Sequence, residues 1–284
     1  MTKTWTQVAS DFQHELADLY PKGEIHQLFL IIFEHITAKK NINYALMAQN
    51  NVGDNDIIKI QTILDELKSN KPVQHIIAEA YFYGNVFEVS EHTLIPRPET
   101  EELVDLIIKD NKGKRDLHII DIGTGSGCIP ISLALNLPGQ YTAVEISPDT
   151  MKVAKRNDLK HQTKVQFIEA DILEWDLIFP AEAQFDIIVS NPPYITPKEK
   201  SEMSPNVLQF EPHLALFVED DAPLLFYDYI ADFALAHLAK NGTLYFEINQ
   251  YLGKETVDLL HKKGFGKVEI IQDINGADRI IRAK

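Results

Sequence analysis

The sequence predicts an α/β protein in which a parallel sheet, covered by helices, follows a small helical domain and a linking β-hairpin. Three observations predict this class. Apolar residues recur at helical spacing over residues 1–75. Short β-branched runs alternate with helical segments over residues 118–248, which implies parallel strands joined by crossovers. A glycine-rich turn at 123–127 joins the first of these strands to the next helix.

Residues 1–75 are expected to form an N-terminal helical domain that recognises the substrate. Leu28, Ile31 and Ile32 recur near helical spacing, and Ile60 and Leu64 do the same further along. The long apolar side chains would pack on one face of each helix.

Residues 76–110 are expected to form a β-hairpin and a linker. Aromatic and β-branched arms within 81–89 flank Gly84-Asn85, a pair suited to a primed two-residue turn. After a proline-stiffened link, Pro98 is a favourable first residue for a helix with carboxylates in its first turn.

Residues 111–284 are expected to form the α/β domain. Its alternating pattern indicates parallel strands, and a turn at Asn275-Gly276 indicates that the chain closes with a hairpin. The expected strands are 118–122, 141–146, 165–170, 185–190, 243–248, 268–274 and 279–282, and the expected helices are 129–137, 148–160 and 222–239.

The charge of the chain argues against a nucleic-acid-binding protein. The formal net charge is −15, and residues 1–95 hold 7 Lys against 12 Asp or Glu, a charge of −5 that leaves −10 for the remainder. Proteins that bind long stretches of phosphate backbone carry clustered Lys and Arg. We therefore expect no stable nucleic-acid partner, although a small basic pocket stays open.

Composition also indicates a cytoplasmic protein without a metal or a membrane segment. Cys128 is the one cysteine, so no internal disulfide can form, and we interpret it as a packing residue. The ten histidines show no paired ligand spacing. The first residues do not resemble a signal peptide, and no apolar run approaches the ~20 residues that cross a bilayer.

The glycine-rich turn is the first candidate ligand site. Glycines let the chain turn sharply and let a ligand approach the backbone, and the N-terminus of the next helix offers free N–H groups. The spacing is G-x-G-x-G, which differs from the G-x-G-x-x-G of dinucleotide sites, and a tight turn without a ligand stays open. The expected cofactor-binding residues here are Gly123, Thr124, Gly125, Ser126 and Gly127.

Acidic residues end the next two strands. Glu145 is placed to accept hydrogen bonds from both hydroxyls of a ribose. Asp171 is placed to accept from an adenine amine, while Ile172 covers the ring. Each acid alone is also compatible with a solvated strand end, but ligands of open α/β sheets bind where these strand ends meet.

The motif Asn191-Pro192-Pro193-Tyr194 follows the strand at 185–190 and indicates the chemistry. Prolines lack N–H donors, so this loop presents acceptors, namely the Asn191 side-chain oxygen and backbone carbonyls. Two acceptors aimed at one –NH₂ group would fix its nitrogen, and Tyr194 would stack on the planar group that bears it. Asn191, Pro192 and Tyr194 are the expected catalytic residues. Together with Pro193 they form the expected substrate site, and Asn191 also borders the cofactor.

These motifs resemble those of class I methyltransferases that methylate nitrogen. The full set is similar to the release factor glutamine methyltransferases, the HemK/PrmC family. Further matching segments are 94–101, Glu211-Pro212 with Ala215-Leu216, and 273–279. The resemblance implies a seven-stranded, Rossmann-like methyltransferase domain, S-adenosylmethionine as cofactor, and class I peptide chain release factors as protein partners.

The resemblance implies methyl transfer to the side-chain amide nitrogen, N5, of the glutamine in a release factor's Gly-Gly-Gln motif. Three alternatives stay open: a ribosomal protein glutamine methyltransferase, an adenine-N6 nucleic-acid methyltransferase, and a non-catalytic cofactor-binding module. The sequence departs from the family pattern at two places. Residue 145 is a glutamate where aspartate is also frequent, and 247–253 lacks, at their usual positions, the glycine and glutamine often seen after that strand in the family. The second departure puts a loop that we expect to be peripheral in doubt.

Overall fold

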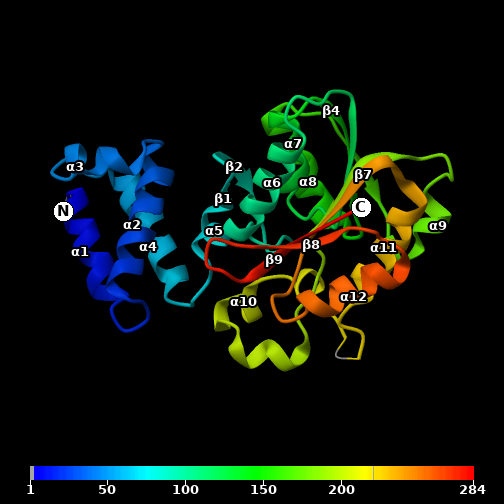
Figure 1. The fold of residues 1–284 in the computed structure, drawn as a ribbon. Helices are drawn as coiled ribbons and strands as arrows, with labels where there is room; N and C mark the ends of the chain where they lie inside the picture. The colour runs from blue at the N-terminus through cyan, green and yellow to red at the C-terminus, as the bar shows by residue number, and fades with distance from the viewer. Residues whose placement is uncertain (1–2, 220) are drawn as a thin grey trace. The chain divides into compact units, whose positions relative to one another are not determined.

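In a computed structural model, which describes residues 3–219 and 221–284, the chain divides into two compact units. One unit holds the chain up to Ala78 together with Ser204–Phe210, and the other holds Glu79–Met203 and Glu211–Lys284. Figure 1 shows the ribbon coloured along the chain. The assignment of 1–75, 76–110 and 111–284 to separate functional domains stays a prediction.

The first unit is helical and is built around aromatic side chains. The Trp5 ring lies 4.9 Å from the Phe33 ring in an edge-to-face contact, and Phe12 and Phe29 are buried beside them. Thr4 and Gln7 form a capping box that begins the first helix. The elements are α1 (Trp5–Glu15), α2 (Lys22–Thr37), η1 (Asn41–Asn43), α3 (Tyr44–Met47), α4 (Asp54–Leu67), α5 (Val73–Ile77) and α10 (Pro205–Phe210).

The second unit contains the strands together with the helices that cover them. Its strands are β1 (Glu79–Phe82), β2 (Asn85–Glu88), β3 (Leu117–Ile122), β4 (Gly139–Glu145), β5 (Val165–Glu169), β6 (Phe185–Ser190), β7 (Leu238–Glu247), β8 (Val268–Gln272) and β9 (Asp278–Ala283). Its α-helices are α6 (Pro98–Asp110), α7 (Cys128–Asn136), α8 (Pro148–His161), α9 (Trp175–Ile178), α11 (Leu225–His237) and α12 (Gly253–Lys263). Its 3₁₀ turns are η2 (Ile172–Glu174), η3 (Pro197–Glu202) and η4 (His213–Ala215).

Seven strands of the described chain form one sheet in the order β5-β4-β3-β6-β7-β9-β8. The pairs from β5 to β7 are parallel, and β9 runs antiparallel to β7 and β8. The chain leaves β3 in one direction through β4 and β5 and then returns to β6 on the other side of β3. This reversal is a topological switch point, where open α/β sheets bind ligands at the carboxyl ends of their strands.

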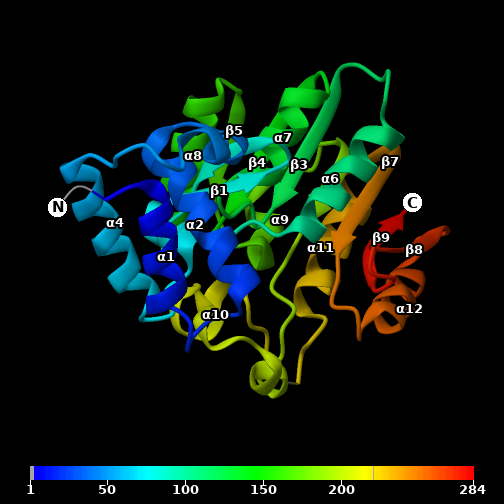
Figure 2. The same cartoon turned by 90° about the vertical axis from the view of Figure 1, so that its left-hand side faces the viewer.

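Successive strand residues point to opposite faces of the sheet, and each face has its own apolar core. Ile119 and Tyr245 pack on the face that α6 and α7 cover, whereas Ile120 and Phe246 pack on the face that α11 and α12 cover. Both faces are thus buried, as parallel strands require. Figure 2 shows α6 alongside β7, and α12 beside β8 and β9.

The hairpin of β1 and β2 turns one residue earlier than the sequence predicts. Phe82 pairs with Asn85, so the turn residues are Tyr83 and Gly84, both with positive φ (46° and 74°), and the prediction of Gly84-Asn85 is wrong. The Asn85 side-chain amide donates to the Tyr83 carbonyl at 3.0 Å. This hydrogen bond stabilises the left-handed backbone at Tyr83, which a propensity argument assigns to glycine and asparagine.

Candidate active site

A cavity of about 540 Å³ lies at the carboxyl ends of β3, β4 and β6. Its size falls within the range of small-molecule sites. Ten of the predicted site residues line it: Gly123, Thr124, Gly125, Ser126, Glu145, Asp171, Ile172, Asn191, Pro192 and Pro193. Gly127 and Tyr194 lie outside this lining, each next to a residue that belongs to it.

The glycine turn leaves open space on its cavity side. Gly123 and Gly125 have φ of 75° and 57°, which glycine adopts at little cost. A Cβ added at either position would meet no heavy atom within 4 Å in the described chain. The Gly123 and Thr124 N–H groups both donate to the Val144 carbonyl, at 2.9 and 3.0 Å, which ties the turn to β4. The backbone therefore forms a fixed cradle with room for a ligand.

Gly127 serves packing. It is the N-cap of α7 with φ of 80°, and a Cβ there would lie 3.0 Å from Cδ1 of Ile131 and 3.4 Å from Cβ of Ala154. A residue with a side chain at this position would have a positive φ and would press on the Ile131 side chain of α7, while it would reach ordinary contact distance from Ala154 of α8. Gly127 therefore has a conformational and packing role, and its predicted contact with a cofactor stays a prediction.

Glu145 is buried at the end of β4 and is held by backbone N–H groups. Its Oε2 accepts from Gly125 N–H and its Oε1 from Ser147 N–H, both at 3.0 Å. Burial raises the pKa of Glu145, and these two N–H groups oppose the rise. Each carboxylate oxygen keeps capacity for a further donor, which is what a pair of neighbouring hydroxyls would need.

Asp171 and Ile172 follow β5 on the same side of the cavity. Oδ1 of Asp171 accepts from Leu173 N–H at 2.9 Å and so caps the short turn η2. Ile172 is buried beside it. The side chains therefore present one carboxylate and one apolar surface, as the sequence analysis expected for the edge and face of a purine ring.

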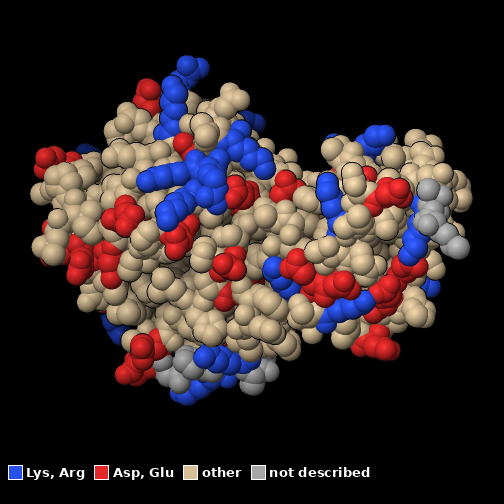
Figure 3. Space-filling view, turned by 180° about the vertical axis from the view of Figure 1, so that it is seen from behind, with Lys and Arg blue, Asp and Glu red and all other residues tan. Residues whose placement is uncertain are grey.

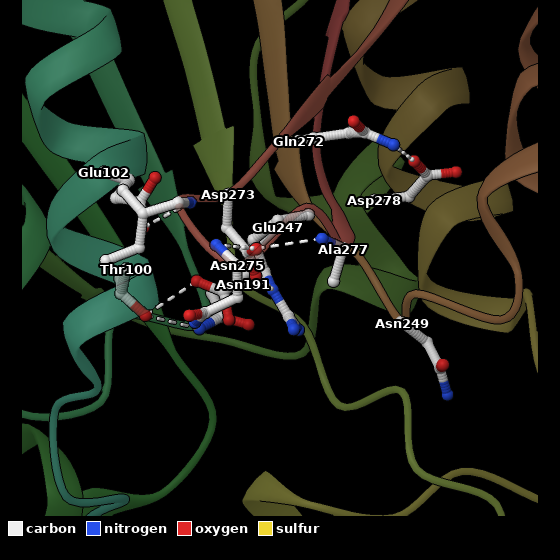
Figure 4. A network of polar contacts seen from close by, with 12 residues as sticks. Thr100, Glu102, Asn191, Glu247, Asn249, Gln272, Asp273, Asn275, Ala277 and Asp278 are labelled. Carbon is white, nitrogen blue, oxygen red and sulfur yellow. Dashed lines mark hydrogen bonds and ion pairs between the residues drawn. The ribbon is translucent and has the colours of Figure 1, made fainter.

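The side of the cavity that Asn191 lines is organised by a series of hydrogen-bonded polar side chains. Asn191 Nδ2 donates to Oγ1 of Thr100 at 3.2 Å, and the Thr100 hydroxyl donates to Oε2 of Glu247 at 2.6 Å. Figure 4 shows the dashed contacts of the Thr100 hydroxyl with Asn191 and with Glu247; the three residues come from α6, the loop after β6 and β7. Tyr194 also donates to Glu247, from its hydroxyl to Oε1 at 3.3 Å.

Glu247 is the buried centre of this chain, with only 2% of its surface exposed. Burial raises the pKa of Glu247, whereas the hydrogen bonds from Thr100 and Tyr194 and the Arg279 guanidinium oppose the rise. Arg279 is itself paired with Asp273 at 3.2 Å. Burial also raises the pKa of Tyr194, so its phenol stays neutral and its hydroxyl is committed to Glu247. Stacking of Tyr194 on a substrate stays a prediction.

The loop after β7 is not peripheral, contrary to expectation. Asn249 is buried, and its side-chain amide donates to the Tyr194 carbonyl at 3.2 Å and to Oε1 of Glu199 at 3.0 Å. Asn249, which lies in the segment that departs from the family pattern, therefore supports the backbone of the 191–194 loop directly.

Glu211 joins two segments of the cavity wall. Its Oε1 pairs with the Arg97 guanidinium at 2.6 Å, and its Oε2 accepts from Ile95 N–H at 3.1 Å. Only 1% of the Glu211 side chain is exposed. Arg97 and Pro212 both line the cavity, so this pair holds the link before α6 against the segment that follows residue 211.

Roles for Thr100, Glu211 and Glu247 were not predicted from the sequence. Each acts on a partner 91 to 147 residues away, which spacing along the chain does not reveal. Two of them do lie in segments that match the family. Thr100 belongs to the 94–101 segment and Glu211 to Glu211-Pro212, so the family resemblance is the signal that could have found them.

Asp121, at the base of the glycine turn, is a further group that the sequence analysis left without a role. It is fully buried, and neither carboxylate oxygen has a hydrogen bond of normal geometry within the described residues. Burial raises the pKa of Asp121 to about 7, the Thr124 hydroxyl opposes the rise and the charge of Glu145 adds to it. Asp121 therefore titrates near neutral pH.

Among the described residues there is neither a reactive thiol nor a metal-binding cluster. Burial raises the pKa of the Cys128 thiol to about 12, so it stays protonated and packs against the core. In residues 3–219 and 221–284, no group of three or more His, Cys, Asp or Glu is arranged to hold a metal ion. Over the same residues, no helix combines the length and the apolar character that crossing a membrane requires.

Comparison with known proteins identifies close relatives. A model of the methyltransferase small domain matches residues 100–209. A release factor glutamine methyltransferase of Flavobacterium psychrophilum is 46% identical over 277 residues, 96% of this chain and 96% of the relative. A protein of the same name from Bacteroides thetaiotaomicron is 40% identical over 278 residues, 98% of this chain and 99% of the relative.

Two solved structures share the fold. The T. thermophilus 16S rRNA N2 G1207 methyltransferase, in complex with AdoMet and guanosine, has a TM-score of 0.52 and 20% identity, over 72% of this chain and 49% of that chain. A methyltransferase from Pyrococcus furiosus has a TM-score of 0.51 and 17% identity, over 81% of this chain and 98% of that chain. At such identities the likeness shows the fold alone, and the predicted seven-stranded, Rossmann-like methyltransferase fold is confirmed.

Proposed function

The chain belongs to the release factor glutamine methyltransferase family, and from this premise we propose that it methylates a class I peptide chain release factor. The methyl group passes from S-adenosylmethionine to N5 of the glutamine in the Gly-Gly-Gln motif. One observation supports the proposal: the same cavity is lined by the open glycine cradle and by Asn191, Pro192 and Pro193, the loop that we expect to hold an amide. A module that only binds a cofactor has no need of the second part.

The residues of the cavity fit S-adenosylmethionine. The open faces of Gly123 and Gly125 accommodate its amino acid portion, Glu145 accepts from the ribose hydroxyls, and Asp171 with Ile172 receives the adenine. When bound, this cofactor supplies an electrophilic methyl group on a sulfonium. Backbone contacts hold the cradle and Glu145 in place, so little reorganisation accompanies binding.

The acceptor amide is a poor nucleophile because its lone pair is delocalised. The Asn191 side-chain oxygen and the Pro192 carbonyl accept its two N–H hydrogens, which fixes the nitrogen in one orientation for in-line transfer. Such positioning and electrostatic preorganisation supply most of the acceleration. No strong base is needed, because the amide nitrogen becomes acidic once it carries the methyl group and a positive charge.

The N-terminal helical unit is proposed to recognise the folded release factor. It exposes Ile42 and Leu46, with 78% and 82% of their surface accessible. Large apolar side chains exposed together are typical of surfaces that bind another protein. With a release factor as its partner, the enzyme is proposed to act in the cytoplasm, without attachment to a membrane and without a stable nucleic-acid partner.

The surface charge is less suited to the adenine-methylating alternative. On the face shown in Figure 3, the largest group of Lys and Arg side chains is limited in extent, and the other Lys and Arg are scattered among Asp and Glu. A duplex-binding enzyme that extrudes a base needs an extended basic surface along the phosphate backbone.

The test is methyl transfer from labelled S-adenosylmethionine to a panel of acceptors under one set of conditions. The panel holds a release factor, its variant with Ala in place of the Gly-Gly-Gln glutamine, a short Gly-Gly-Gln peptide, a ribosomal protein and adenine-containing DNA. Label is expected in the intact release factor, less in the peptide and none in the Ala variant. Label in the ribosomal protein or the DNA, with none in the release factor, would overturn the proposal.

A further inference from the structure

The hydrogen bonds that link Asn191 to Thr100 and Thr100 to Glu247 run in one direction from donor to acceptor, because Glu247 only accepts hydrogen bonds. The hydrogen bonds from Thr100 and Tyr194 converge on the buried Glu247, and an ionised carboxylate has no proton to donate. Burial raises the pKa of Glu247, and three neighbours oppose this rise and stabilise the ionised form: the Thr100 hydroxyl, the Tyr194 hydroxyl and the Arg279 guanidinium. The Thr100 hydroxyl therefore donates its proton in the hydrogen bond to Glu247.

This direction passes on to the Asn191 amide. A hydroxyl has one proton, so Thr100 has only its oxygen lone pairs left for Asn191. The group of Asn191 that meets Thr100 must then be the –NH₂, and the contact of 3.2 Å joins Nδ2 to Oγ1 accordingly. The two ends of an amide are opposed, so the Asn191 oxygen points away from Thr100. This orientation follows from the carboxylate and does not depend on telling nitrogen from oxygen in the side chain.

We propose that Glu247 and Thr100 are positioning residues, which act in series to turn the carbonyl oxygen of Asn191 toward the acceptor nitrogen. An amide turned the other way would present two donors to an –NH₂ group and would repel it. The motif at 94–101 thus contributes to catalysis through Thr100, which α6 brings to the loop after β6 from its first turn. Glu247 does so from the end of β7.

The proposal rests on the proposed function for the nature of the acceptor, and the experiment separates the two. Thr100→Val keeps the shape of the side chain and removes the hydroxyl, and Thr100→Ser is the matched control that keeps it. Both variants are compared with the wild-type chain for kcat and KM toward a release factor and for the Kd of S-adenosylmethionine.

For Thr100→Val, kcat is expected to fall by about 10- to 100-fold, somewhat less than for removal of a group that contacts the reacting atoms. The Kd of S-adenosylmethionine is expected to change by less than about twofold, and Thr100→Ser is expected to keep kcat within about threefold of wild type. A wild-type kcat in Thr100→Val would overturn the proposal. Equal losses in Thr100→Val and Thr100→Ser would also overturn it, because the hydroxyl would then not be the active feature.

A second readout needs no acceptor at all. The side-chain ¹⁵N–H₂ resonances of Asn191, identified by their loss in Asn191→Asp, report the hydrogen bond of Nδ2. They are expected to shift in Thr100→Val and to stay in place in Thr100→Ser. Unchanged resonances in Thr100→Val would overturn the proposal even in an active enzyme. If the wild-type chain methylates no release factor while these resonances shift as expected, the proposed function fails and the orientation of Asn191 stands.

Discussion

The two sides of the cavity are held in place by different kinds of contact. On the cofactor side, backbone groups do the holding: the Val144 carbonyl accepts from the glycine turn, and Glu145 accepts from the N–H groups of Gly125 and Ser147. On the acceptor side, side chains from α6, β7 and the loop after β6 hold one another.

Because of this difference, we expect the two sides of the cavity to tolerate substitutions differently. A backbone cradle depends on local chain geometry, and its side chains can be changed one at a time. A side-chain network depends on every member, because each buried polar group that loses its partner carries a cost of about 1–3 kcal/mol. We therefore expect changes on the cofactor side to weaken binding in steps and changes on the acceptor side to stop turnover.

Asn191→Ala should give the largest effect. Without the side-chain oxygen, the acceptor nitrogen loses one of its two fixed contacts, and kcat should fall by about 10²- to 10³-fold. Stopped-time assays with saturating release factor measure the rate, and calorimetry measures S-adenosylmethionine binding, which should stay within about threefold of wild type. If turnover stayed near normal, the acceptor nitrogen would be held elsewhere.

Glu145→Ala should have a smaller effect of the opposite kind. Loss of hydrogen bonds to a charged group costs about 1.5–3 kcal/mol, so the Kd of S-adenosylmethionine should rise by about 10- to 100-fold. At saturating cofactor, kcat should recover to within a few-fold, since Asn191 and its partners are untouched. Glu145→Gln, which keeps the shape and one carbonyl oxygen, is the control. A variant that binds normally but fails to turn over would remove the distinction between the two sides.

Asp121→Asn should change stability in a pH-dependent way. The pKa of Asp121 is raised from 3.8 to about 7, so between these values the unfolded chain gives up the proton before the folded chain does, and the wild type loses stability as pH rises. Asparagine cannot ionise. The variant should therefore gain at least about 1 kcal/mol over wild type at pH 8 and less at pH 5.

Thermal unfolding of the cofactor-free protein at both pH values measures this difference. An equal gap in Tm between variant and wild type at pH 5 and pH 8 would show that Asp121 does not titrate in this range.

The same difference explains what the sequence predicts and what it misses. The parallel strands, the glycine turn and Asn191–Tyr194 are local patterns, and the structure contains each predicted strand. β6 has the predicted ends, and each of the other strands differs at one or both ends by one to five residues. The largest shift is at β7, which begins at Leu238 where 243 is expected. The turn at Tyr83 is missed because a side-chain hydrogen bond outweighs backbone propensity there. Thr100 and Glu247 are missed because their partners are set by the three-dimensional fold alone.

The central claim is that one amide nitrogen receives one methyl group, and mass mapping of the product tests it most directly. A class I release factor is incubated with the enzyme and S-adenosylmethionine, digested and sequenced by mass. We expect a gain of about 14 Da, one methyl in place of one hydrogen, on the side chain of the Gly-Gly-Gln glutamine. An unmodified glutamine, or a methyl group carried by another residue of the release factor, would contradict it.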